Sequence, residues 1–132
     1  MQLSKFTDYS FRVLIALGTS VREKRYTAEE LAIELNTSEH HLKKVVQRLA
    51  QKGYILAAKG RNGGLTLSRP AAEINLGEVL LDMEENMNIV GCFADANDCP
   101  LLHKGCRLKG LITDALSDFV AKFHHYTLAD II

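Results

Sequence analysis

The sequence has no cysteine outside one short stretch, and it lacks the features of several common protein classes. Of its 132 residues three are cysteine, and all three fall between residues 91 and 109. Structural zinc sites usually show two cysteines separated by two residues, and that spacing is absent. No apolar run approaches the 18 residues expected of a membrane span. Charges interrupt the first 18 residues too often for a signal peptide. We therefore expect a cytoplasmic protein, with no membrane partner, whose thiols stay reduced.

Sequence motifs of enzymes are also missing. The chain holds no phosphate-cradling glycine loop, no nucleophile elbow and no pair of carboxylates in an evident cleft. Its length corresponds to one domain, or to a small domain with an appendage. We therefore expect a protein that is not an enzyme.

The formal net charge is zero, but the two halves of the chain carry opposite charge. Residues 1–69 hold 12 Lys and Arg against 6 Asp and Glu, whereas residues 70–132 hold 4 against 10. The first half thus has six excess positive charges and the second half six excess negative charges. This asymmetry indicates that the first half meets a polyanion and that the second half has another task.

The basic half has the pattern of a helix-turn-helix. Helices are predicted over residues 4–18, 28–35 and 39–51, the second opened by a capping box at Thr27 and the third capped by Ser38. In the third helix, apolar residues recur at i, i+3, i+4 and i+7, which predicts one buried face. The opposite face carries polar and basic residues, namely His40, His41, Lys43, Lys44, Gln47 and Arg48. Such a helix is typical of one that enters the major groove of DNA.

A β-hairpin is predicted directly after this motif. Residues 54–59 and 65–68 read as two strands, and the glycine-rich residues 60–64 between them read as the turn. A hairpin in this position is a wing, whose tip can reach the minor groove. We predict that double-stranded DNA is contacted by Ser38, His40, His41, Lys43, Lys44 and Arg48 of the helix, and by Arg61, Asn62 and Gly63 of the wing.

The acidic half is predicted to hold two more helices, over residues 74–85 and 107–125. The second has a broad apolar stripe at helical spacing from Leu108 to Phe123, which needs a partner. A symmetric homodimer that reads a palindromic operator satisfies that need, although the stripe could also pack on its own domain. The predicted fold is mainly α with a small β-hairpin wing. A winged helix-turn-helix domain spans residues 1–75, and residues 76–132 hold the cysteine segment and a dimerisation helix.

Cys92, Cys99 and Cys106 are separated by six residues each, in a stretch rich in Gly, Pro, Asp and Asn that reads as a loop. Three thiolates that a loop brings together suit a metal or an iron–sulfur cluster. Three buried thiols, one disulfide with a spare thiol, and zinc are the alternatives. Three cysteines leave a tetrahedral or cubane site one ligand short, and His103 is one candidate for it.

Several stretches together resemble the BadM/Rrf family of bacterial winged-helix regulators over essentially the full length. They are LSKFTDYSFRVLIALG, GRNGGLTLSRP followed by AAEINLGEVL, CPLLHKGCRLKGLITDAL, and the ending YTLADI. Within the family, the chain is most similar to the nitric-oxide-sensing iron–sulfur repressors. Regulators of iron–sulfur assembly in the same family carry a histidine three residues after the last cysteine, where this chain has Lys109.

The resemblance implies a homodimeric repressor with a 4Fe–4S cluster, which nitric oxide degrades so that the operator is released. It also implies that Cys92, Cys99 and Cys106 ligate the cluster, and that Asp8 of the other subunit is the fourth ligand. Asp8 and Arg12 lie four residues apart on one helix, a spacing typical of an ion pair. A sensor with a 2Fe–2S cluster and a regulator that senses redox through its thiols without a cluster are the alternatives.

Overall fold

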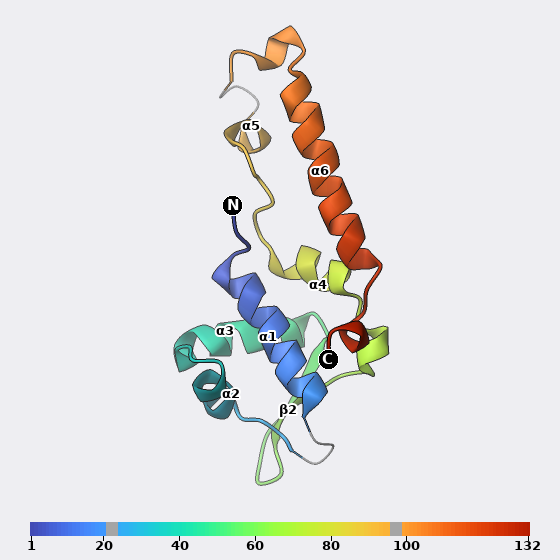
Figure 1. Cartoon of the computed structure of the whole chain (residues 1–132). Helices are drawn as coiled ribbons and strands as arrows, with labels where there is room; N and C mark the ends of the chain where they lie inside the picture. The colour runs from blue at the N-terminus through green and yellow to red at the C-terminus, as the bar shows by residue number, and fades with distance from the viewer. Residues whose placement is uncertain (21–23, 96–98) are drawn as a thin grey trace.

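The first helix forms the centre of residues 1–75, which we call the winged part of the molecule. A computed structural model describes residues 1–20, 24–95 and 99–132 (Figure 1). Helix α1 spans Lys5–Thr19 and begins where the hydroxyl of Ser4 accepts the backbone N–H of Thr7 at 3.1 Å. Its buried face includes Val13, Leu14 and Leu17, which pack among the helices that follow.

Two helices joined by a tight turn follow, as the sequence predicts. Helix α2 spans Ala28–Glu34, and helix α3 spans Glu39–Gln51. The capping box at the start of α2 is formed in both directions, because Thr27 and Glu30 each accept the other's backbone N–H, at 3.1 and 2.8 Å. Asn36 takes a positive φ of 49°, which lets the chain reverse before Ser38 caps α3.

The wing is a two-stranded antiparallel hairpin. Strand β1 spans Ile55–Ala58 and strand β2 spans Gly64–Leu67, with Ile55 opposite Leu67 and Ala58 opposite Gly64. Figure 1 shows the hairpin projecting below α1 and α2. Strand β2 is also joined to the segment before α2 by a backbone hydrogen bond from Leu65 to Tyr26 of 2.7 Å. The wing is therefore fixed to the helix-turn-helix at its base.

The remaining elements lead into a long terminal helix. They are η1 (Ala71–Glu73), α4 (Leu76–Met83), α5 (Gly91–Ala94), η3 (Leu102–Lys104), α6 (Arg107–His124) and η4 (Leu128–Asp130). Figure 1 shows α6 rising away from the winged part, with α5 at its far end. After α6 the chain returns to the winged part, where the backbone N–H of Leu128 donates to the carbonyl of Ile74 at 2.8 Å.

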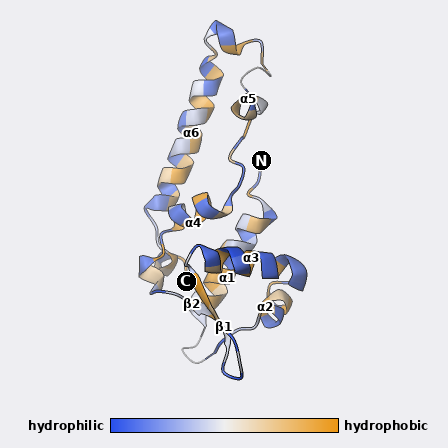
Figure 2. Cartoon of the chain, turned by 180° about the vertical axis from the view of Figure 1, so that it is seen from behind, coloured by the Kyte–Doolittle hydropathy of each residue, from blue (hydrophilic) through white to orange (hydrophobic). Residues whose placement is uncertain are grey.

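A single hydrophobic core joins α1, α2, α3, α4 and η4. Its fully buried side chains are Leu14, Leu31, Leu42, Leu49, Ile55, Ile74, Leu80, Met83, Leu128, Val13, Val45 and Val79. Helix α6 adds no fully buried residue to this core in the single chain, and only its Phe123 packs against the edge of the core. In Figure 2 its ribbon alternates hydrophobic and hydrophilic stretches along its length. Within the described ranges, no helix is both long and apolar enough to cross a membrane.

The predicted fold class is confirmed, with one correction to a helix boundary and one to the cysteine segment. The helix predicted over residues 74–85 begins two residues later, at Leu76, because Asn75 caps it by accepting the N–H groups of Gly77 and Glu78. The cysteine segment, predicted as a loop, contains the short helices α5 and η3. Residues 96–98 of that segment lie outside the described residues.

Candidate nucleic-acid interface and cysteine segment

Helix α3 presents one polar face to solvent. Ser38, His40, Lys43 and Lys44 are all exposed there, as the sequence predicts. The ammonium of Lys43 lies 2.6 Å from the carboxylate of Glu39, one turn earlier, and this hydrogen bond raises the pKa of Lys43. Lys43 therefore stays cationic at neutral pH, which is the charge that contact with phosphate requires.

Two residues predicted on this exposed face lie elsewhere. The ring of His41 is half-buried against α1, where it contacts Phe6 and Tyr9 edge-on at centroid distances of 6.4 and 5.3 Å. Arg48 is also half-buried, and its guanidinium donates to the backbone carbonyl of Asp82 at 3.5 Å. Both are less exposed than the other residues of the polar face, because helical periodicity does not reveal which neighbouring element approaches a helix from the side. Their contact with DNA stays a prediction.

The tip of the wing exposes Arg61 and Asn62. Gly63 is required by the turn itself, since a Cβ atom there would overlap the backbone of Ala58 and lie 2.8 Å from the carbonyl oxygen of Gly60. Arg25, which sequence reasoning missed, donates to the backbone carbonyl of Asn62 at 2.7 Å. The wing tip is thus braced by a cation that adds to its positive charge. The run of basic residues before α2 was the available signal.

A carboxylate that the sequence did not single out joins α3, β1 and α4. Asp82 accepts hydrogen bonds from Lys52 Nζ at 2.6 Å and from Tyr54 Oη at 2.7 Å. Burial by itself raises the pKa of Asp82, but these hydrogen bonds outweigh it and the net pKa is lowered. Burial and the bond to Asp82 raise the pKa of Tyr54, so the phenol stays a donor. This cluster holds the carboxyl end of α3 against α4.

The three cysteines are free thiols and all are half-buried. Cys92 lies in α5, Cys99 precedes η3, and Cys106 occupies the N-cap position of α6. His103 is exposed within η3. Figure 1 places this segment at the end of α6 that is remote from the winged part. The sequence-predicted sulfur ligands thus share one end of the molecule.

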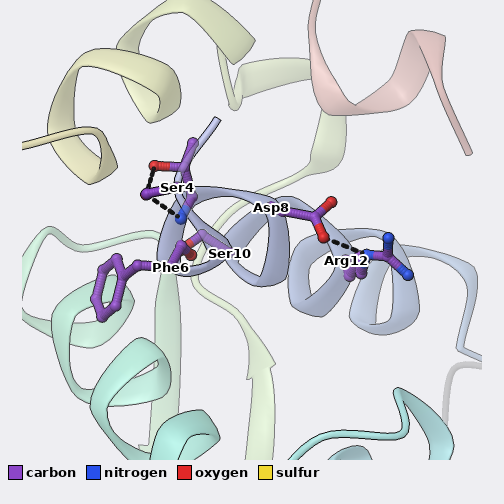
Figure 3. A network of polar contacts seen from close by, with 6 residues as sticks. Ser4, Phe6, Asp8, Ser10 and Arg12 are labelled. Atoms are coloured by element: carbon purple, nitrogen blue, oxygen red, sulfur yellow. Dashed lines mark hydrogen bonds and ion pairs between the residues drawn. The ribbon is translucent and has the colours of Figure 1, made fainter. Parts of the chain in front are cut away.

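Asp8 lies in the winged part, on α1. Its carboxylate accepts a hydrogen bond from Arg12 Nε at 2.9 Å, and this bond raises the pKa of Arg12 (Figure 3). About half of each side chain is exposed, 46% for Asp8 and 54% for Arg12. The expected ion pair is therefore present. Asp8 remains open to solvent, so a ligand or a second protein surface can reach it.

The donor set fits an iron–sulfur cluster in its chemistry. Thiolates are the preferred protein ligands of such clusters, and each iron takes its own protein ligand. Across the part of the chain that the structure describes, no three His, Cys, Asp or Glu side chains gather as they would around one metal ion. That finding is compatible with a cluster, whose ligands need not converge on a single ion. Asp8 would add a harder oxygen ligand.

Comparisons with known proteins identify the family of the chain. The profile of the Rrf2 family, described as "Iron-dependent Transcriptional regulator", matches residues 3–132. The "HTH-type transcriptional regulator NsrR" of Geobacillus kaustophilus is 41% identical, covering 100% of this chain and 90% of that protein. The regulator of the same name from Bacillus subtilis is 38% identical, with the same coverage.

Solved structures show the same fold. CymR, the global cysteine regulator of B. subtilis, matches with a TM-score of 0.71 at 23% identity, over 99% of this chain and 95% of that one. T. potens IscR matches with a TM-score of 0.78 at 18% identity, over 99% and 85% of the two chains. The chain therefore belongs to the Rrf2 family of transcriptional regulators, which are winged helix-turn-helix DNA-binding proteins and not enzymes.

Proposed function

We propose that the chain is a homodimeric transcriptional repressor whose affinity for a palindromic operator is gated by an iron–sulfur cluster that reacts with nitric oxide. The single observation that carries this proposal is the pairing of three free, half-buried thiols at one end of α6 with a DNA-binding winged helix at the other. The iron-dependent family and the relatives named NsrR support it.

The DNA-contacting groups of the proposal lie in residues 1–75. Ser38, His40 and Lys44 are exposed at the amino-terminal half of α3, which in this class of motif faces base edges. Arg61 and Asn62 extend the contact from the wing tip. Residues 76–132 supply the sensing and dimer-forming groups. This division is one of function, because Val79 and Leu128 pack in the same core as α1 and α3.

The dimer of the proposal is supported by apolar surface on α6. Leu108 and Leu111 are 61% and 66% exposed in the single chain. Beside them, an apolar groove of about 790 Å³ is lined by α6, by the chain start and by the segment after α4. The lining residues include Leu3, Ile89, Ile112, Leu116, Phe119 and Phe123. A second copy of α6 would cover surface of this kind.

The cluster of the proposal is 4Fe–4S, held by Cys92, Cys99 and Cys106 of one subunit and by Asp8 of the other. Asp8 lies on α1, whereas Figure 1 shows the cysteine segment at the end of α6 remote from the winged part, an arrangement that favours a ligand from a second subunit. When bound, the cluster would supply a site where nitric oxide reacts. The single oxygen ligand would leave one corner more labile than the three sulfur-bound corners.

The protein's own residues would convert this event into a change of DNA affinity. When Asp8 is engaged by the other subunit, its ion pair with Arg12 weakens, and α1 is tied to the far end of the partner. When Asp8 is released, the pair reforms and the two winged parts can shift relative to each other. Two recognition helices fit the half-sites of a palindrome only at the matching spacing. A difference of ~3 kcal/mol in the free energy of DNA binding between the two states would weaken binding about a hundredfold.

The test is anaerobic purification followed by the absorption spectrum, iron and sulfide content, and titration with nitric oxide while binding to a palindromic duplex is followed. We expect about four irons per chain, a broad band that bleaches, and release of DNA in step with bleaching. About two irons per chain would favour a 2Fe–2S sensor instead. A colourless protein whose binding responds only to thiol oxidants would replace the cluster with thiol sensing.

A further inference from the structure

The contact between α1 and α3 is built around the imidazole of His41. His41 lies in the first turn of α3, and its backbone N–H donates to the hydroxyl of Ser38 at 3.2 Å. Its ring meets the rings of Phe6 and Tyr9 edge-on. The Nε2 atom is buried and has no hydrogen-bond partner among the residues that the structure describes. A polar atom is therefore held in an aromatic setting that does not satisfy it.

Two further side-chain contacts connect this site to Asp8. The guanidinium of Arg12 lies over the ring of Tyr9, 5.7 Å from its centroid, while its Nε donates to Asp8. Around α1, Asp8, Arg12, Tyr9 and Phe6 follow one another at helical spacing. Figure 3 shows Asp8 and Arg12 on one side of α1 and Phe6 on another. A continuous path of side chains thus joins the carboxylate to the start of the recognition helix.

An imidazole with an unsatisfied nitrogen is a poor choice for packing alone. A phenyl ring would fill a similar space without leaving a polar atom unpaired. The imidazole gains a partner for Nε2 if its ring turns outward, towards the exposed side of α3 where His40 and Lys44 lie. Besides the observed position between Phe6 and Tyr9, rotation of the side chain would give His41 a second position, turned towards DNA. Coupling between distant sites requires a two-position element of this kind.

We propose that Tyr9 and His41 are positioning residues that couple the Asp8–Arg12 pair to the recognition helix. With Arg12 paired to Asp8, its guanidinium lies over Tyr9 and the ring of His41 is seated between Tyr9 and Phe6. When Asp8 binds the other subunit instead, Arg12 is no longer held over Tyr9. The ring of His41 can then rotate towards solvent and change the orientation of the first turn of α3. This inference rests on the proposed function, because it needs Asp8 to be the residue whose partner changes.

The first test compares the DNA affinity of cluster-loaded and cluster-free protein for His41→Ala, His41→Phe and Tyr9→Leu. For the parent protein we expect a ratio of at least tenfold. For His41→Ala and Tyr9→Leu the ratio should fall to about twofold or less, with iron content and absorption spectrum unchanged. The double variant Tyr9→Leu/His41→Ala should show no further loss, because the two residues act in series. His41→Phe should also lose the ratio while it keeps the packing.

The matched control is His40→Ala, one residue away on the same turn. His40 is exposed and contacts neither Phe6 nor Tyr9 in the described structure, so its loss should weaken DNA binding equally in both states and leave the ratio intact. A parental ratio near one would overturn the proposed function itself, and this inference with it. A normal parental ratio that survives in His41→Ala or His41→Phe would overturn this inference alone.

A second test needs no cluster. In cluster-free protein, Asp8→Asn should weaken the pairing with Arg12 and shift the imidazole NMR signals of His41, whose ring lies in the ring-current fields of Phe6 and Tyr9. The signals of His125, beyond the end of α6, should stay in place. Unmoved His41 signals would show that Asp8 and His41 are not coupled, whether or not a variant alters DNA binding.

Discussion

Asp82 occupies the point where the recognition helix, the wing and α4 meet. Lys52 at the end of α3 and Tyr54 at the start of the wing both donate to its carboxylate, and Arg48 donates to its backbone carbonyl. The guanidinium of Arg69 lies 5.2 Å from the centre of the Tyr54 ring. One acidic residue therefore sets how α3 and the hairpin are presented together.

Asp82→Asn should destabilise the fold at neutral pH by about 1 kcal/mol, since it weakens hydrogen bonds to a charged acceptor. Burial raises the pKa of Asp82, but the hydrogen bonds from Lys52 and Tyr54 lower it by more than burial raises it. The folded pKa therefore lies below the ordinary value of about 3.9. Because the pKa of Asp82 is lower in the folded state, its carboxylate stabilises the fold at pH values above the ordinary pKa. This stability is lost as the pH falls through the folded pKa. Urea unfolding from pH 7 to pH 2.5 should show the gap between parent and variant closing below about pH 4. Glu85→Gln, at an exposed carboxylate, should show no comparable gap.

Lys44 is an exposed cation on the face of α3 that we assign to DNA. Lys44→Ala should weaken binding to all duplexes by a similar factor and reduce the slope of log K against log salt by about one ion, as loss of one phosphate contact does. Lys122→Ala, in the last turn of α6, is the control and should leave the slope unchanged. A loss confined to one operator sequence would instead assign Lys44 to base recognition. Titrations at several salt concentrations measure both quantities.

At the level of single residues, sequence reasoning found the groups but not all of their surroundings. The positions of Ser38, His40 and Lys44 follow from the periodicity of α3, because exposure on a helix repeats with the turn. His41 and Arg48 depend on where α1 and α4 pack, which involves contacts distant in sequence. The role of Asp82 could not be predicted from the sequence, since a single carboxylate near the end of a helix is in most cases exposed to solvent.

The packing of α4 against α6 depends on a glycine. A Cβ atom at Gly77 would overlap the imidazole of His124. The same junction is closed by Asn75, whose amide donates to the carbonyl of His124 at 2.8 Å and whose side-chain oxygen lies 3.0 Å from His124 Nδ1. The base of α6 is therefore held by two polar contacts, and the imidazole in one of them lies where a side chain at residue 77 would be.

Gly77→Ala should destabilise the protein by about 1–3 kcal/mol, because the added methyl forces α6 away from α4. Gly110→Ala is the matched control, since a Cβ at residue 110 meets no atom within 4 Å. In the interior of α6 it should stabilise the helix by up to about 1 kcal/mol. Thermal unfolding of the two variants under one condition measures the contrast. Equal stability of both variants would mean that α6 is not held at His124.

Elements defined by local signals were predicted more accurately than elements that depend on distant contacts. The predicted bounds of α3 agree with the structure, because Ser38 caps it and Gly53 follows its last turn. The turns within the cysteine segment were missed because its Gly, Pro and Asp residues outweigh short helical runs. The helix that carries the apolar stripe was predicted from local spacing, whereas the second chain of the proposed dimer has no signal in local spacing.

The whole molecule separates opposite charges along its length. The basic half forms the winged part, and the acidic half includes α6 and the cysteine segment. In the proposed regulator, this separation would direct the winged part towards DNA and keep the cysteine segment away from it. It would also keep the apolar face of α6 clear of DNA, so that the two chains of the proposed dimer could join there while both winged parts remain accessible.

Leu111→Lys tests this assembly with little effect on a single chain. The side chain of Leu111 is 66% exposed, so the isolated fold should lose less than about 1 kcal/mol. In the proposed dimer the same lysine would be buried against apolar surface without a partner, which should weaken association by at least about 2 kcal/mol, or roughly thirtyfold. Sedimentation equilibrium should then show monomer at concentrations where the parent is a dimer.

Asp114→Lys is the control, because it places the same side chain three residues away, at an exposed position outside the apolar stripe of α6. It should remain dimeric. The monomeric Leu111→Lys protein should bind a palindrome no better than an isolated half-site, because the gain from two linked recognition helices is lost. If Leu111→Lys stayed dimeric and kept its preference for the palindrome, α6 would not be the interface. The apolar face would then require a different partner.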